Sequence, residues 1–177
     1  VHHTPLTINR SDYVRLGAEC AIAVQLNTDL PASGAPYTRE TVAKAVDAVM
    51  PAFELIEDRG ADYSDLFFLG VMADNAWNAG LVLGEPIIEW QGIDLESAAG
   101  EMVINGEPVG GGKGGDALGH PLEALAWLAN SLAERGQSLK RDMVVMTGSI
   151  VSTKFLDQGD EVSFDIDTLG EVWLTVD

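Results

Sequence analysis

The chain has 177 residues, of which 46% are hydrophobic and 21% charged, and its formal net charge is −18. This composition is typical of one folded domain with a sizeable core, and it excludes a disordered chain. An acidic surface repels phosphate groups, so we exclude nucleic acids and anionic membrane surfaces as partners.

Residues 14–26 alternate in the manner of a strand. One face is apolar and is expected to contact the core; it consists of Cys20, Ile22, Val24 and Leu26. The opposite face carries Glu19 beside the small residues Ala21 and Ala23, which leave space and favour the floor of a pocket. A solvent-facing glutamate on an ordinary strand is the alternative. Because Cys20 is the only cysteine, no intrachain disulfide forms, and we expect a cytoplasmic protein.

Prolines and a glycine mark residues 29–37 as a loop, and Thr38 is a suitable N-cap for a helix that follows it. We expect this helix to end at Pro51, because the residue before a proline avoids the helical conformation. Its apolar stripe has helical spacing and consists of Val42, Ala45, Val46 and Val49.

A short strand is predicted over residues 52–56, with Glu54 on the face opposite Phe53 and Leu55. A carboxylate between residues that favour burial is costly without a partner or a metal ion. Glu54 is therefore the second candidate for a functional carboxylate.

Buried strands are predicted over residues 66–72 and 80–83, with a polar segment between them. The apolar run over residues 66–73 is too short to cross a bilayer. Residues 101–109 form a predicted hairpin around Asn105-Gly106. The glycine-rich residues 110–119 lack the phosphate-loop pattern, so we expect a mobile loop beside a site.

A helix is predicted from Pro121 to the stop at Gly136, with His120 as a cap or packing residue rather than a catalytic one. The last strands are predicted over residues 143–146, 162–166 and 171–176. Strands are many, helices are few, and there is no regular βαβ alternation. We therefore expect an α+β fold with a mixed, mostly antiparallel sheet.

Two common kinds of enzyme site are disfavoured. There is no Gly-x-Ser-x-Gly elbow for a serine hydrolase, and the three histidines are too few and badly spaced for zinc. Carboxylates remain, and Glu19 and Glu54 are oxygen ligands of the kind that favour Mg²⁺, Mn²⁺ or Ca²⁺.

Several short motifs, in the same order, resemble the 2-oxopent-4-enoate hydratase and 4-oxalocrotonate decarboxylase family of the fumarylacetoacetate hydrolase superfamily. They are RLGAECAIAV at 15–24, DLP at 29–31, MPAFE at 50–54, ADNA at 73–76, LGHPL at 118–122, TGS at 147–149 and GD at 159–160. The family's first metal-binding glutamate falls at Gly17, on the same strand face as Glu19.

The resemblance implies one catalytic domain over residues 1–177, of fumarylacetoacetate hydrolase C-terminal type, which lacks an N-terminal region. It implies a divalent-metal-dependent hydratase for 2-oxo or 2-hydroxydienoate acids in aromatic catabolism, with Mg²⁺ or Mn²⁺ on Glu19 and Glu54, and a homo-oligomer. Asp74, Asn75 and Thr147 are the implied substrate-binding residues, although a turn and a bulge explain them equally well. A decarboxylase, an acylpyruvate-type hydrolase and a non-catalytic partner subunit remain open as alternatives, and no general base is assigned.

Overall fold

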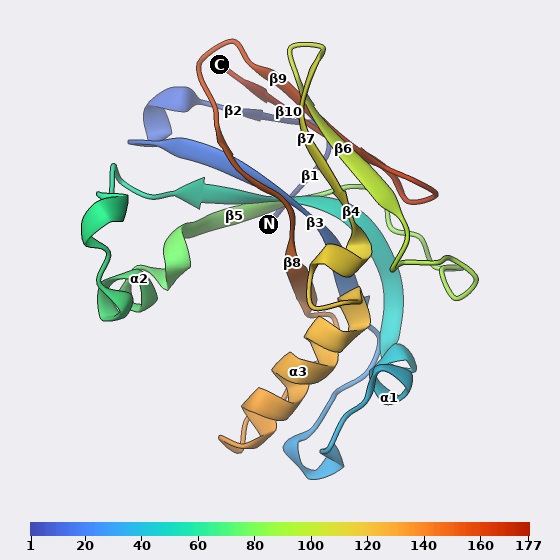
Figure 1. Ribbon diagram of the computed structural model, residues 1–177. Helices are drawn as coiled ribbons and strands as arrows, with labels where there is room; N and C mark the ends of the chain where they lie inside the picture. Colours follow the sequence, from blue (N-terminus) through green and yellow to red (C-terminus); the bar gives the residue numbers. More distant parts are fainter.

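Two five-stranded sheets form the body of the protein in a computed structural model that describes residues 1–177 (Figure 1). The first sheet has the spatial order β1-β5-β4-β3-β8. Its strands, in that order, span His2–His3, Asn78–Leu83, Val46–Glu57, Leu16–Leu26 and Val144–Phe155. The second sheet has the order β2-β10-β9-β6-β7. Its strands span Leu6–Ile8, Gly170–Val176, Glu161–Ile166, Ala99–Ile104 and Glu107–Lys113.

Only β1 with β5 and β2 with β10 pair in parallel, and the remaining pairs are antiparallel. The predicted α+β fold with mixed, mostly antiparallel sheets is therefore confirmed. The hairpin at Asn105-Gly106 joins β6 to β7 as expected, and both residues have positive φ, as the tight turn requires.

Three short α-helices complete the fold, and they span Arg39–Ala43 (α1), Phe68–Ala73 (α2) and Pro121–Ala133 (α3). Single 3-10 turns lie at Arg10–Asp12, Ala32–Gly34, Tyr63–Asp65, Asn75–Trp77 and Gly114–Asp116. Helix α3 begins and ends close to its predicted limits, and His120 caps it, because its Nδ1 accepts a hydrogen bond of 3.0 Å from the Leu122 N–H. No helix is long and apolar enough to span a membrane.

The core lies where the two sheets face each other. The apolar face predicted for the first long strand is confirmed, since Cys20, Ile22 and Val24 of β3 are fully buried. Phe53 of β4 meets Phe164 of β9 with their ring centroids 6.5 Å apart. Alternation along β3 and β4 therefore sends the other set of side chains, which includes Glu19 and Glu54, to the opposite face of the first sheet.

The predicted helix over the segment before Pro51 is wrong beyond its first turn. Helix α1 ends at Ala43, and β4 runs through Pro51 to Glu57. β-Branched valines favour a strand, and the pairing of residues 46–50 with β3 outweighs the helical spacing. The Pro51 carbonyl accepts from Gly84 just past the end of β5, so the missing proline N–H falls where the ladder stops.

Two further predictions are wrong and one is incomplete. The segment predicted as a buried strand over residues 66–72 instead contains α2, which is exposed and projects from the sheets (Figure 1). The glycine-rich segment is not one loop, because residues 110–113 complete β7 and a 3-10 turn follows. A Cβ at Gly112 would lie 2.7 Å from the Ile150 carbonyl oxygen, so glycine permits β7 to approach β8 closely. The strand predicted over residues 143–146 extends to Phe155.

Candidate functional site

The two predicted carboxylates lie directly opposite each other. Glu19 of β3 pairs with Glu54 of β4 in the antiparallel register. Residues that face each other in this way share one face of the sheet, with Cβ atoms about 4.5–5.5 Å apart. The structure therefore brings together two residues that are 35 positions apart in the sequence.

Each carboxylate is held by a residue of the strand on its outer side. The Asn78 amide of β5 donates to Glu54 Oε1 at 2.7 Å. The Thr153 hydroxyl of β8 donates to Glu19 Oε1. Because β5, β4, β3 and β8 are neighbours in that order, the four side chains form one polar row across the sheet. We call Asn78, Glu54, Glu19 and Thr153 the polar row.

Asn78 and Thr153 were missed in the sequence. The pattern placed the start of β5 at Gly80 and the end of β8 at Met146, so both residues fell outside the predicted strands. The polar residues that follow Thr147 in β8 are the only local sign that this strand contributes to the site.

The side chains beside the polar row are apolar, and the predicted pocket floor of Ala21 and Ala23 is buried rather than open. Ala23 is fully buried, and it packs in a cluster with Ala48, Met50, Ala52 and Leu83. Glu19 and Glu54 are only partly buried at the edge of this floor. The carboxylates are therefore partly accessible, whereas the apolar cluster beside them is covered by neighbouring side chains.

Charge explains why the pair needs a partner. Neither Glu19 nor Glu54 forms a salt bridge, and like charges directly opposite on neighbouring strands destabilise a sheet. One oxygen of each carboxylate accepts from the outer strand, and the other oxygen has no hydrogen bond within the protein. This pair of free carboxylate oxygens fits a hard divalent cation.

The protein supplies two ligands to such a cation and not three. No group of three or more His, Cys, Asp or Glu residues is arranged to hold a metal ion. Gly17 lies on the same face as Glu19 and has no donor to offer. Mg²⁺ is commonly bound through one or two carboxylates, with water and ligand oxygens in the remaining positions, so the two glutamates fit this mode of binding.

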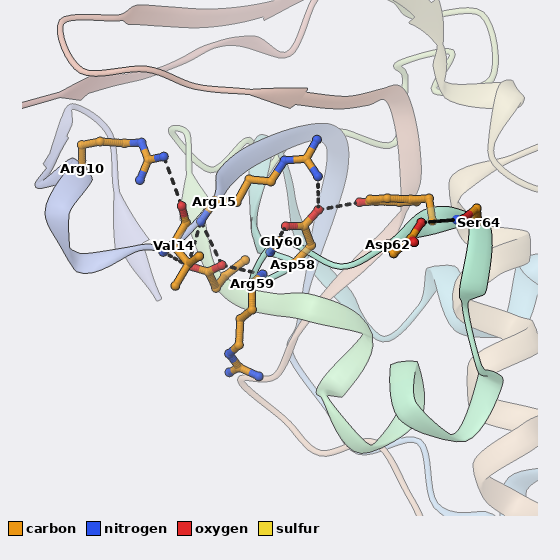
Figure 2. A network of polar contacts seen from close by, with 10 residues as sticks. Arg10, Val14, Arg15, Asp58, Arg59, Gly60, Asp62 and Ser64 are labelled. Carbon is orange, nitrogen blue, oxygen red and sulfur yellow. Dashed lines mark hydrogen bonds and ion pairs between the residues drawn. The ribbon is translucent and has the colours of Figure 1, made fainter.

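A second polar network lies at the ends of β3 and β4 (Figure 2). The Asp58 carboxylate is 2% exposed, and its Oδ2 accepts from Arg15 Nη1 at 3.1 Å and from the Tyr63 hydroxyl at 2.9 Å. The Arg15 guanidinium stacks on the Phe155 ring, 3.6 Å from its centroid. Desolvation, the Asp58 hydrogen bond and charge, and a smaller contribution from the charge of Glu19 raise the pKa of Tyr63. Tyr63 therefore lies within electrostatic reach of Glu19.

The three predicted substrate-binding residues lie in different places. Asp74 pairs with Arg59 and, together with Asp58 and Trp77, lines a cavity of about 260 Å³. Asn75 is exposed with a positive φ of 52°. Thr147 is buried, and its hydroxyl donates to the Ile22 carbonyl at 2.8 Å.

The register separates Thr147 from the carboxylate pair. Its hydroxyl contacts the Ile22 carbonyl, three residues along β3 from Glu19, which corresponds to roughly 10 Å at the rise of a strand. The structure therefore brings Glu19 and Glu54 together and leaves Asp74, Asn75 and Thr147 outside the polar row.

The whole chain, residues 1–177, matches the family model described as fumarylacetoacetate (FAA) hydrolase C-terminal. A 2-hydroxyhexa-2,4-dienoate hydratase of Comamonas testosteroni is 34% identical over 165 residues, which are 93% of this chain and 61% of that protein. A 4-oxalocrotonate decarboxylase of Pseudomonas putida is 35% identical over 159 residues, or 89% of this chain and 58% of the relative. The chain thus spans about 60% of the length of these relatives.

Solved structures of related proteins are also similar to this chain. The 4-oxalocrotonate decarboxylase from Pseudomonas putida G7, complexed with magnesium and adipate, superposes with a TM-score of 0.91 at 30% identity, covering 99% of this chain and 66% of the other. Fumarylpyruvate hydrolase from Pseudomonas aeruginosa, complexed with Mn²⁺ and pyruvate, has a TM-score of 0.73 at 16% identity, with 97% and 69% covered, and it shares the fold.

Proposed function

Because the chain belongs to the fumarylacetoacetate hydrolase C-terminal family, we propose that it acts as a divalent-metal-dependent hydratase on 2-oxo or 2-hydroxydienoate acids in aromatic catabolism. Relatives named as hydratases at 31–34% identity support the reaction class. A 2-oxo-acid decarboxylase is the alternative within the same chemistry, supported by the decarboxylase relatives. An acylpyruvate-type hydrolase is the third candidate activity.

The observation that carries this proposal is the opposed pair of carboxylates without a cationic partner. Glu19 and Glu54 would hold Mg²⁺ or Mn²⁺ through their free oxygens. When bound, such an ion withdraws electrons from a coordinated oxygen and stabilises an enolate, which hydration and decarboxylation of 2-oxo acids both need. Solved relatives in complex with magnesium, calcium or manganese support a cation of this class.

The residues of the chain have separate tasks in this proposal. Asn78 and Thr153 hold the two carboxylates in fixed orientations. The buried apolar cluster around Ala23 supports the strands that carry the two carboxylates. Asp74, Asn75 and Thr147 are proposed to contact the substrate, with the Asp74 cavity as the support for the first of them. A homo-oligomer is part of the proposal as well.

A non-catalytic partner subunit is the second candidate. Gly17 favours it, since the site has two protein carboxylates and no third. This candidate predicts that the protein binds other subunits and leaves a dienoate unchanged.

The first test is loss of the dienoate ultraviolet band when the protein is mixed with Mn²⁺ and 2-hydroxypenta-2,4-dienoate. Glu54→Gln keeps the shape of the side chain and removes its charge, so we expect at least a 100-fold lower rate, about 3 kcal/mol at the transition state. Glu107→Gln, on the exposed β6–β7 hairpin, is the matched control and should retain the full rate.

Three results distinguish the candidates. Carbon dioxide release from 4-oxalocrotonate with no hydration would favour the decarboxylase. Mn²⁺ binding without turnover of any dienoate would favour the partner subunit. No binding of Mg²⁺ or Mn²⁺ to the wild-type protein would contradict the metal-dependent function itself.

A further inference from the structure

Gly17 occupies an unusual position for a glycine. It lies inside β3, which has β4 on one side and β8 on the other, and glycine weakens the interior of a strand unless another group approaches closely. The group that approaches is Thr153. A Cβ at position 17 would lie 2.8 Å from Thr153 Cγ2 and 3.4 Å from both the Lys154 carbonyl oxygen and the Phe155 ring.

Thr153 therefore has two contacts with different atoms. Its methyl group fills the space that a side chain at position 17 would need. Its hydroxyl donates to Glu19 Oε1 and leaves the other carboxylate oxygen free. One small side chain thus excludes a larger residue at one position and orients the carboxylate at the next position on the same face.

We infer that Thr153 is a positioning residue for the carboxylate pair: its hydroxyl sets the orientation of Glu19, and its methyl group takes the side-chain space of position 17. This inference rests on the proposed cation site. It limits that site to two protein carboxylates, because any larger residue at position 17 must first displace Thr153. Groups that hydrogen-bond to a metal ligand typically change metal affinity about 10- to 100-fold when they are lost.

Two substitutions of Thr153 separate the role of its hydroxyl, which orients Glu19, from the role of its methyl group, which fills space beside Gly17. Thr153→Val keeps the shape and removes the hydroxyl, whereas Thr153→Ser keeps the hydroxyl and removes the methyl group. By calorimetric titration with Mn²⁺, we expect Thr153→Val to bind at least tenfold more weakly than wild type. Thr153→Ser should restore affinity to within threefold of wild type. Thr7→Val, which removes an exposed hydroxyl from the second sheet, is the matched control.

The second measurement needs no metal ion. Gly17→Ala places its Cβ against Thr153 and should lower the melting temperature of the EDTA-treated protein by about 5 °C, the usual range for overpacking in a chain of this size. Adding Thr153→Ser to Gly17→Ala should recover most of that loss, and adding Thr153→Val should recover none.

The outcomes are separable. If wild type binds Mn²⁺ and Thr153→Val binds it equally well, the positioning role is wrong and the proposed function stands. If wild type binds no Mn²⁺, the function and the positioning role are both wrong. If Thr153→Ser does not relieve Gly17→Ala, the packing role is wrong, whatever the titration shows.

Discussion

At the scale of single residues, Asp58 is the most completely buried acidic residue, at 2% exposure. A buried carboxylate is tolerated when it is paired and hydrogen-bonded. Asp58 meets this condition, since it accepts from Arg15, from the Tyr63 hydroxyl and, through Oδ1, from the Gly60 N–H at 2.9 Å. Removing the carboxylate leaves three donors without their acceptor.

Asp58→Ala should therefore destabilise the fold by about 2–4 kcal/mol, because an uncompensated partner of a buried pair is costly. Thermal or urea unfolding measures the change. Tyr63→Phe removes only one donor and should cost about 1 kcal/mol. A melting temperature for Asp58→Ala equal to that of Tyr63→Phe would show that the ion pair contributes nothing to stability.

The sequence identified Glu19 and Glu54 for a physical reason. Both lie on the face opposite the apolar residues of a period-2 pattern, and this alternation is local information. It does not reveal Asn78 or Thr153, because their contacts depend on which strands become neighbours. The pairing of β5 with β4 and of β8 with β3 is set by packing of the whole sheet and by its bulges.

At the scale of elements, the start of α3 depends on the protonation state of His120. Burial, followed by the charge of Arg39, lowers the pKa of His120 from its ordinary 6.5. The neutral ring is the form that accepts from the Leu122 N–H and caps the helix. A lowered pKa in the folded state means that stability is present above pH 6.5 and is lost as pH falls through the folded pKa.

Unfolding free energy should thus decrease as pH falls below 6.5 and through the lowered folded-state pKa of His120, beyond the change caused by the carboxylates. His120→Asn supplies a cap that does not titrate, so this part of the pH dependence should disappear while stability at pH 7 stays within about 1 kcal/mol of wild type. Urea unfolding of both proteins across this range is the measurement. Parallel pH profiles would rule out the cap as the titrating group.

The same scale explains which elements were predictable. Helix α3 has a cap, a proline at its first position, a broad apolar face and Gly136 at its end, and all of these are local signals. The first half of β4 has apolar residues at a spacing that fits a helix or a strand, and only its pairing with β3 decides between them. α2 has a similarly ambiguous apolar run, and nothing in its local sequence shows that it would project from the sheets.

At the scale of the whole molecule, charge is the dominant feature. The net charge is −18, and only five salt bridges pair an acidic with a basic side chain. Folding brings these like charges closer together, which opposes the compact state, and salt screens them over about 10 Å at 0.1 M.

Raising NaCl from 10 mM to 300 mM in the presence of EDTA should consequently raise the melting temperature by several degrees. KCl at the same ionic strength should give the same shift, since screening does not depend on which monovalent cation is present. Scanning calorimetry is suitable for this comparison. A constant or falling melting temperature would mean that self-repulsion does not limit stability.

The polar row also determines which fragments of the chain could form the candidate site. Its members come from positions 19, 54, 78 and 153, and the Thr153–Glu19 hydrogen bond alone joins residues 134 positions apart. Every continuous fragment that omits either Glu19 or Thr153 lacks part of the row, so no short peptide or half-chain reproduces it. The polar row therefore exists only while the first sheet is folded. Unfolding of β3, β4, β5 or β8 removes one of its four residues.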